Sequence, residues 1–309
     1  MMKNTDGAGT ASIIRALSHK CPIPFCIAIH LLNCLASGAA TLPTAGQNPD
    51  LVLGALSSTA TVKPVDLASA RGIDISPSAG EPTLQDFASI RRQGYHFVIV
   101  AGWGGVNPNC HAQVQLNRAR SAGLLTAGYC YLNFASSLDG RRQVREALTA
   151  FGTEAACLGF LAIDVETSAR NQLSPGLHKT PPDPSAQRQA IERIAEAIQQ
   201  VQQAGLRPIL YTKMRDWQQV TGDTQQFKNV PLWNPRTLGG DNINRPALTS
   251  PDHAFGGWAC RIGKQYQLDA TLDNPRILVD LDVFDLSAFS PSSTKDHQAF
   301  DAPIVTAEN

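Results

Sequence analysis

The chain has 309 residues, in which 26 Lys and Arg balance 26 Asp and Glu, with 43% hydrophobic and 6% aromatic residues. This length allows one large domain or two smaller ones, and the apolar content is sufficient for a sizeable buried core. A formal charge of zero argues against nucleic acid as a partner and against a polybasic membrane-surface protein, because both need a local excess of Lys and Arg.

The first 39 residues have the pattern of a secretory signal peptide. Residues 1–20 are weakly basic, residues 22–35 form an apolar run, and the small residues 36–40 follow it. A basic region, a short apolar region and a small-residue cleavage site are typical of such signals. We therefore expect residues 1–39 to be removed and the protein to be extracellular or periplasmic; an uncleaved anchor or a disordered leader is the alternative. The apolar run is short for a membrane span, so no stable membrane association is expected.

Strands and helices alternate in the middle of the chain, between a linker-like segment at residues 40–70 and a loose tail at residues 287–309. Such alternation predicts βαβ units and a parallel sheet. The expected strands are residues 72–76, 96–102, 126–134, 159–167 and 208–213, and the expected helices are residues 84–94, 112–122, 141–156 and 185–204.

Three further strands are expected at residues 230–234, 256–262 and 277–284, joined by loops rich in Pro, Gly and Asn. Eight strands, the last three without full helices, predict an irregular α/β barrel of the TIM type over residues 71–286. An open Rossmann sheet is the competing fold, but no G-x-G-x-x-G motif follows any strand. The sequence therefore indicates no nucleotide cofactor.

Acidic side chains stand inside or at the end of three apolar strands, where burial of a charge is costly. They are Asp74 in the first strand, Asp164 and Glu166 in the fourth, and Asp280 and Asp282 in the last. In an α/β barrel the reaction takes place at the carboxyl ends of the strands. Two carboxyl groups on one face of a strand cannot both ionise cheaply, so one pKa rises, and glycosidic bond cleavage needs such an acid beside an ionised partner. Because the first and last strands of a closed barrel are neighbours, these acids are expected around one mouth.

Seven motifs in order resemble the lysozymes of glycoside hydrolase family 25, over about 215 residues. The motifs are GIDIS (72–76), FVIVAGWGG (97–105), GLLTAGYCY (123–131), LAIDVET (161–167), ILYT (209–212), PLW (231–233) and VDLDVFD (279–285). The resemblance implies an irregular β/α barrel and a muramidase that cuts the β-1,4 bond between N-acetylmuramic acid and N-acetylglucosamine in peptidoglycan. It implies Glu166 as general acid and Asp164 as the stabilising or orienting group, with Asp74 and Asp280 completing the catalytic cluster.

The resemblance also shows departures. Asp282 stands where these lysozymes commonly carry Asn, and we place it among the substrate-binding residues. Residues 100–104 read VAGWG where a Lys-Ala-x-Glu-Gly run is frequent, and residues 264–266 read KQY where Trp-Gln-Tyr is expected, with Trp258 as a possible substitute. These differences favour altered subsites over loss of the catalytic acids.

Aromatic residues near strand ends are the further substrate-binding candidates. Tyr129 and Tyr131 share one face of the third strand, and that face is directed either into the barrel or against the helices. Trp103 and Trp233 follow strand ends, where they either stack on sugar rings or fill the core.

Four cysteines follow the predicted signal, at positions 110, 130, 157 and 260. They form disulfides in one of three pairings or stay as free thiols, and their wide spacing argues against a metal site.

The sequence thus predicts a secreted, monomeric glycoside hydrolase without cofactor or metal, acting on peptidoglycan or a related N-acetylated glycan. Two alternatives remain open. One is a non-hydrolytic glycan-binding protein on the same barrel. The other is a hydrolase of another N-acetylated glycan such as chitin, although the chitinase pattern D-x-x-D-x-E is absent.

Overall fold

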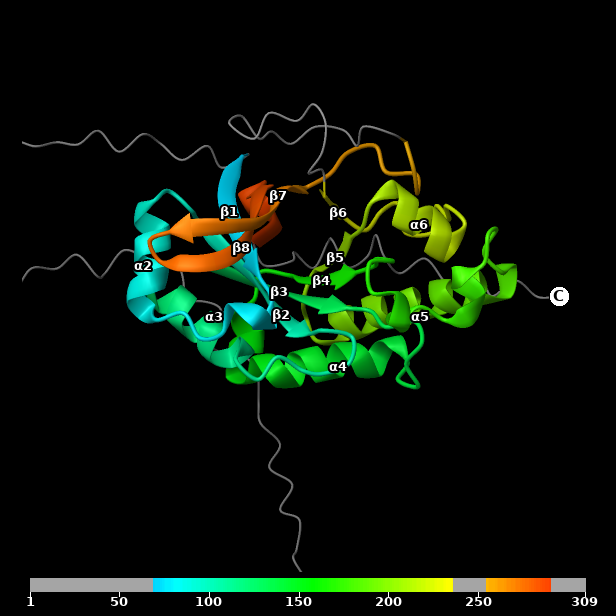
Figure 1. Ribbon diagram of the computed structural model, residues 1–309, viewed down its shortest axis with the longest axis horizontal. Helices are drawn as coiled ribbons and strands as arrows, with labels where there is room; N and C mark the ends of the chain where they lie inside the picture. The colour runs from blue at the N-terminus through cyan, green and yellow to red at the C-terminus, as the bar shows by residue number, and fades with distance from the viewer. Residues whose placement is uncertain (1–68, 236–253, 290–309) are drawn as a thin grey trace, which may run out of the picture. The chain divides into compact units, whose positions relative to one another are not determined.

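The computed structural model describes residues 69–235 and 254–289. The predicted signal peptide, nearly all of the predicted linker and most of the predicted tail lie outside these residues. The described chain forms a closed barrel of eight strands in sequence order, with helices around the outside (Figure 1). The prediction of an irregular α/β barrel is confirmed.

Seven strands run parallel to one another, and β8 runs antiparallel to both of its neighbours, β7 and β1. The strands are β1 (Ala70–Ile75), β2 (Phe97–Trp103), β3 (Leu125–Tyr131), β4 (Leu161–Asp164), β5 (Pro208–Tyr211), β6 (Leu232–Pro235), β7 (Gly263–Asp273) and β8 (Arg276–Phe284).

An α-helix follows each of the first five strands. These are α2 (Leu84–Arg92), α3 (Ala112–Ser121), α4 (Gly140–Phe151), α5 (Pro184–Gln203) and α6 (Met214–Thr221), with short 3-10 helices η1 (Pro77–Ala79), η2 (Gly152–Cys157), η3 (Arg170–Gln172), η4 (Pro175–His178) and η5 (Leu286–Phe289). Side-chain caps fix the start of α2, where Thr83 and Asp86 form a capping box, and of α4, where Asp139 accepts from the Arg142 amide. Such caps satisfy amides that the first helical turn leaves unpaired. Within the described ranges, no helix has the length and apolar character needed to cross a membrane.

The seventh strand is not where the sequence pattern placed it. Residues 256–262 form a loop, because Gly256 and Gly257 adopt positive φ angles of 56° and 75° and turn the chain. The apolar residue that suggested a strand there, Trp258, packs its ring 4.9 Å from that of Trp217 beneath α6. The true β7 begins inside the barrel with the buried polar residues Lys264 and Gln265. Its outer half leaves the barrel as a hairpin with β8, in which exposed and buried residues alternate from Asp269 to Asp273. The far end of this hairpin rests on α2, where Ser89 donates a hydrogen bond to the Asn274 carbonyl at 2.9 Å.

Aromatic rings close the end of the barrel at which the parallel strands begin. The rings of Phe97, Phe160 and Phe284 are fully buried there, and Phe289 of η5 lies 4.9 Å from Phe97 and 5.0 Å from Phe160 between ring centroids. The barrel therefore extends to residue 289, beyond the boundary at residue 286 that composition suggested. The opposite end, where the parallel strands finish, is left open for polar groups.

Candidate active site

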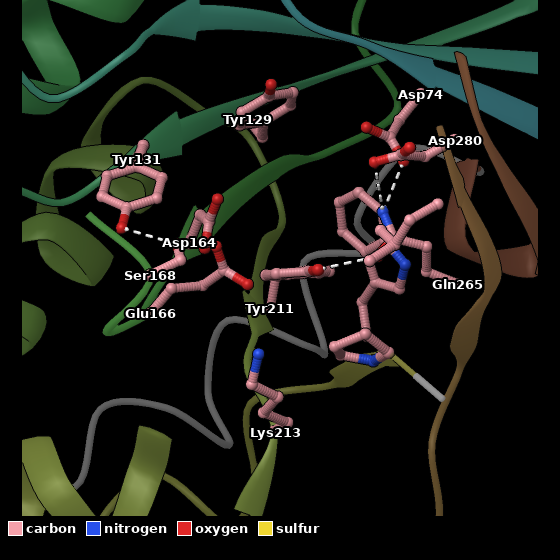
Figure 2. Close-up of a pocket in the computed structure, with 13 residues that line it drawn as sticks. Asp74, Tyr129, Tyr131, Asp164, Glu166, Ser168, Tyr211, Lys213, Gln265 and Asp280 are labelled. Atoms are coloured by element: carbon pink, nitrogen blue, oxygen red, sulfur yellow. Dashed lines mark hydrogen bonds between the residues drawn. The ribbon is translucent and has the colours of Figure 1, made fainter. Parts of the chain in front are cut away.

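Four carboxyl groups predicted from the sequence meet at the open end of the barrel. Asp74 lies near the end of β1, and Asp280 of β8 is its direct partner in the antiparallel register. Asp164 is the last residue of β4, and Glu166 follows two residues later. All four line one cavity of about 320 Å³. Figure 2 shows Asp164 and Glu166 on one side of this cavity and Asp74 and Asp280 on the other, with Tyr211 between them.

The remaining wall of the cavity combines aromatic, polar and aliphatic groups. Three predicted residues, Tyr129, Tyr131 and Trp233, belong to it. The other members are Ser168, Tyr211, Lys213, Pro235, Gln265 and Leu268. Aromatic and apolar walls with a small number of placed polar groups are the usual lining of a small-molecule site.

Gln265 of β7 joins two of the acids. Its amide nitrogen donates to Asp74 Oδ2 at 2.9 Å and to Asp280 Oδ2 at 3.2 Å, while its oxygen accepts from the Tyr211 hydroxyl at 2.8 Å. The Asp269 amide donates to the other oxygen of Asp280 at 2.7 Å. These bonds hold both carboxyl groups in fixed orientations at the rim of β1 and β8.

The two acids that Gln265 joins resist ionisation. Burial, followed by the neighbouring charge of Asp280, raises the pKa of Asp74 from 3.8 to about 7. Burial also raises the pKa of Asp280 to about 6, although the hydrogen bond from the Asp269 backbone opposes the change. Near neutral pH this pair therefore carries less negative charge than two ordinary aspartates would.

Asp164 is buried against β4, with 7% of its surface exposed. Burial raises its pKa well above the ordinary value, and the charges of Glu166 and Asp74 act in the same direction. Within the described residues, no protein group donates to its Oδ1 atom. A carboxyl oxygen without a protein donor, in the wall of a cavity, is available to a ligand.

Glu166 lies beyond the strand and is more exposed than Asp164. Burial raises its pKa, while a hydrogen bond from Ser168 at 2.9 Å and the charge of Lys213 act against that increase. The Ser168 hydroxyl is in turn 3.3 Å from the hydroxyl of Tyr131 in β3, so Ser168 links Glu166 to β3. Glu166 is thus an acid with a raised pKa and access to the cavity, as proton donation to a leaving group requires.

Lys213 faces the acids from the end of β5 (Figure 2). Its ammonium lies 3.3 Å from Asp216 Oδ2 in α6, and Thr167 donates to the other oxygen of that buried carboxylate at 2.6 Å. The cation is therefore fixed within the site by a group that is not itself part of the cavity wall.

Two predicted substrate-binding residues do not line the cavity. Trp103 is 4% exposed and belongs to the core, where its indole N–H is 3.3 Å from the Gln143 side-chain oxygen of α4. Asp282 is fully buried and accepts from the Trp233 indole N–H at 2.9 Å. Both assignments are corrected: β2 directs Trp103 against the helix layer, and β8 directs Asp282 below the cavity floor.

Trp258 does not replace the missing tryptophan of the KQY segment. It is 6% exposed, its indole N–H donates to the Val230 carbonyl at 2.8 Å, and it packs in the core beside Phe255. The wall therefore lacks that aromatic ring, and the aliphatic Leu268, which is 47% exposed, is found in it instead.

Six wall residues were not among the predicted site residues: Ser168, Tyr211, Lys213, Pro235, Gln265 and Leu268. Tyr211 and Lys213 stand at or just after the end of the fifth strand, where an α/β barrel carries its site residues, so this position could have identified both. Gln265 was missed because the seventh strand was expected at residues 256–262, which put Gln265 in a loop.

The cysteines at positions 110, 130, 157 and 260 are all free thiols. No group of three or more His, Cys, Asp or Glu side chains within residues 69–235 and 254–289 is arranged to hold a metal ion.

A family model described as lysozyme-like protein 1 matches residues 66–266, which include β1 to β6, the D-x-E segment and Gln265. The chain belongs to this lysozyme-like family. The resemblance to family 25 lysozymes noted in the sequence is confirmed, since a curated relative from Dictyostelium discoideum bears the name probable GH family 25 lysozyme 3.

That relative is 28% identical over 233 residues, which cover 74% of this chain and 44% of the relative. This chain thus matches less than half of the Dictyostelium protein. Lysozyme-like protein 2 of Caenorhabditis elegans is 28% identical over 208 residues, covering 65% of this chain and 69% of the relative.

Solved structures share the barrel. The family GH25 lysozyme of Aspergillus fumigatus aligns with a TM-score of 0.54 at 18% identity, covering 75% of this chain and 98% of that one. A muramidase from Acremonium alcalophilum gives a TM-score of 0.53 at 23% identity with the same coverage. At such identities the likeness shows the fold.

Proposed function

We propose that this protein is a secreted glycoside hydrolase of the muramidase type, which cleaves β-1,4 bonds in peptidoglycan. The observation that carries the proposal is the pairing of Glu166, a partly exposed acid with a raised pKa, with Asp164, whose Oδ1 has no protein donor within the described chain, in one cavity. Membership of the lysozyme-like family supports the same reaction.

Glu166 acts in this proposal as the general acid. Its raised pKa keeps a larger fraction of the group protonated near neutral pH than for an exposed Glu, so it can protonate the glycosidic oxygen as the bond breaks. Ser168 restrains the Glu166 rotamer through the 2.9 Å hydrogen bond. Because this bond favours the carboxylate form, it helps Glu166 to release its proton.

Asp164 acts on the sugar at the cleavage point. Its Oδ1 accepts the N–H of the substrate N-acetyl group and so directs the acetyl carbonyl toward the anomeric carbon. Asp74 and Asp280, fixed by Gln265, supply negative potential on the opposite wall and stabilise the positive charge that develops on the sugar ring.

The sugar rings contact the cavity through Tyr129, Tyr131 and Trp233, with Leu268 completing the apolar wall. Trp233 is held edge-on against Tyr211, with ring centroids 4.5 Å apart, so its position is set before substrate arrives. A preformed wall reduces the entropy lost on binding.

The test compares clearing of suspended bacterial cell walls by the wild type, by Glu166→Gln and by Glu192→Gln. Glu192 is exposed on α5, away from the cavity, so its variant controls for loss of one carboxylate. We expect wild-type clearing from Glu192→Gln and a loss of about 10²-fold or more in kcat from Glu166→Gln, the range expected for a general acid. Mass spectrometry of the fragments, with N-acetylmuramic acid at the new reducing ends, identifies the bond.

The other outcomes contradict the proposal. Equal clearing by wild type and Glu166→Gln would remove Glu166 from the mechanism. Retention of the wild type on cell walls without any fragment released would identify a glycan-binding protein, and release of fragments from chitin but not from cell walls would identify a hydrolase of that polymer.

The proposed localisation is extracellular or periplasmic, on the basis of the residue pattern at positions 1–39. Expression of the chain with and without these residues, followed by assay of cells and medium, tests it. Export of the longer form alone, with a new N-terminus near Ala40, is the expected result, and equal retention of both forms in the cells would contradict the proposal.

A further inference from the structure

Asp282 is buried directly beneath the carboxyl cluster. It lies on β8 opposite Gly72 of β1 and Gln265 of β7, and none of its surface is exposed. It is therefore a carboxyl group in the barrel interior, which substrate does not reach.

The two oxygens of Asp282 have different surroundings. Oδ1 accepts from the Trp233 indole N–H at 2.9 Å. Within the described residues, no protein group donates to the buried Oδ2 atom. Asp74 stands diagonally across from Asp282, two residues beyond Gly72 on the same face of β1, and a hydrogen bond between the two carboxyl groups contributes to the pKa of each. Two carboxylates accept only, so a hydrogen bond between them exists only when one of them carries the proton.

We infer that Asp282 is a positioning residue that keeps its proton in the working enzyme and donates it to Asp74, holding that carboxyl against the cavity. This inference rests on the proposed function only where activity is concerned. The donated bond satisfies the Oδ2 oxygen, removes a charge that burial makes costly, and gives Asp74 a second donor besides Gln265.

The electrostatics favour the proton on Asp282. Burial, then the charge of Asp74, raises the pKa of Asp282 well above the ordinary value, and the same contact lowers the pKa of Asp74. The titratable groups that face Asp282 are Asp74 of β1, Asp280 of its own strand, and the phenols of Tyr211 and Tyr266. Each of these groups is neutral when protonated and negative when it has lost its proton, so none of them stabilises a negative charge on Asp282. Lys264 precedes Gln265 on β7 and points to the opposite face of that strand.

Two substitutions separate a neutral donor from an ionised carboxylate. Asp282→Asn keeps the shape, an acceptor for Trp233 and a donor for Asp74, but it cannot ionise. Asp282→Leu has similar volume and offers neither donor nor acceptor. If Asp282 is protonated, Asn reproduces its role and Leu does not.

The first readout is the melting temperature of the full chain between pH 5 and pH 9, which does not depend on activity. A raised pKa in the folded state means that stability is lost as pH rises toward that pKa. We expect the wild type to lose stability with rising pH more steeply than Asp282→Asn, which should melt higher than the wild type at pH 9. Profiles that run parallel, or a lower melting temperature of Asp282→Asn at pH 9, would overturn the inference.

The second readout is cell-wall hydrolysis. We expect Asp282→Asn to keep kcat within about threefold of wild type and to stay active at higher pH, because its donor to Asp74 does not titrate. Asp282→Leu should lose about tenfold or more in kcat with KM little changed, since Asp74 loses its orientation and the cavity wall remains. Equal losses in both variants would overturn the inference. An inactive wild type would refute the proposed function, and the melting profiles would still decide the state of Asp282.

Discussion

Asp74 and Asp280 face each other as direct partners across the antiparallel seam between β1 and β8, and one amide, that of Gln265, donates to both. The pair exists because β8 returns antiparallel and closes the barrel against β1. Asp74, Asp164 and Glu166 come from the carboxyl ends of β1 and β4, which are parallel strands. The closure of the barrel thus supplies Asp280 and places it beside Asp74.

This pair predicts that the folded protein loses stability as the pH rises. The pKa values of Asp74 and Asp280 are raised from 3.8 to about 7 and about 6, so the folded state holds protons that the unfolded chain releases. Their contribution to stability is complete below pH 3.8 and is lost as pH rises through 6 and 7. One pKa unit corresponds to about 1.4 kcal/mol, and 1 kcal/mol moves the melting temperature of a domain of this size by about 2–4 °C. We therefore expect the melting temperature to fall by about 5 °C or more between pH 5 and pH 8.

Calorimetry of the wild type and of Asp280→Asn measures this loss. The variant lacks one of the two groups and relieves the charge on Asp74, so its melting temperature should fall less over the same range. A melting temperature of the wild type that rises from pH 5 to pH 8 would show that the cluster is ionised in the folded protein.

Ser168 sets the proton affinity of Glu166. Its hydroxyl donates to Glu166 Oε2 at 2.9 Å, which favours the ionised carboxylate and opposes the effect of burial on the pKa. Ser168→Ala removes the donor, so the pKa of Glu166 rises further. The alkaline limb of the kcat profile, where a general acid loses its proton, should therefore move to higher pH.

A pH series of cell-wall hydrolysis checks this shift against Ser121→Ala, which changes an exposed serine at the end of α3. The control should retain the wild-type profile. An alkaline limb that moves to lower pH in Ser168→Ala, or does not move, would mean that Ser168 does not act on the group that limits the rate.

The barrel and its acids were predictable because the relevant signals are local. Asp74 and Asp164 interrupt apolar strands, and burial of a charge inside such a strand demands a reason. Neighbouring first and last strands follow from closure alone, which explains why Asp280 was placed beside Asp74.

The remainder depends on tertiary structure that local patterns do not carry. The run at residues 256–262 has the composition of a strand, yet two glycines with positive φ turn it, and Trp258 packs under α6. β7 carries an apolar alternation at Tyr266, Leu268, Ala270 and Leu272. It begins, however, with two buried polar residues, Lys264 and Gln265, so the apolar pattern alone did not place Gln265 in a strand. Period-two reasoning likewise cannot tell that Trp103 meets α4 and that Asp282 stays below the cavity floor.

The charge of Lys213 opposes the rise that burial causes in the pKa of both Asp164 and Glu166. Lys213→Met retains the length of the side chain and removes its charge, so the pKa of both acids should rise and the alkaline limb should move to higher pH. The change also leaves the buried Asp216 carboxylate with Thr167 as its remaining described side-chain donor. We expect a stability loss of about 1–2 kcal/mol, less than for a fully buried pair, because the Lys213 side chain is 46% exposed.

Lys228→Met is the matched control, since Lys228 is exposed and lies away from the cavity. This variant should have the same pH profile of kcat and the same urea unfolding curve as the wild type. If Lys213→Met shifts the unfolding curve but keeps the wild-type pH profile, the Lys213 ammonium stabilises Asp216 of α6 and does not affect the pKa of the catalytic acids.

Phe289 makes η5 part of the barrel and not of a tail. Its ring contacts Phe97 and Phe160 at the closed end, and 9% of its surface is exposed. Phe289→Ala opens a cavity among rings that the strands hold in place, and such truncations cost about 3–5 kcal/mol. Val106→Ala, at a residue that is 56% exposed, should cost less than about 0.5 kcal/mol. Urea unfolding of the two variants beside the wild type measures both values. Because the rings lie at the end of the barrel opposite the acids, the kcat of folded Phe289→Ala should remain near that of the wild type; a loss of activity without a loss of stability would contradict this placement of the chain end.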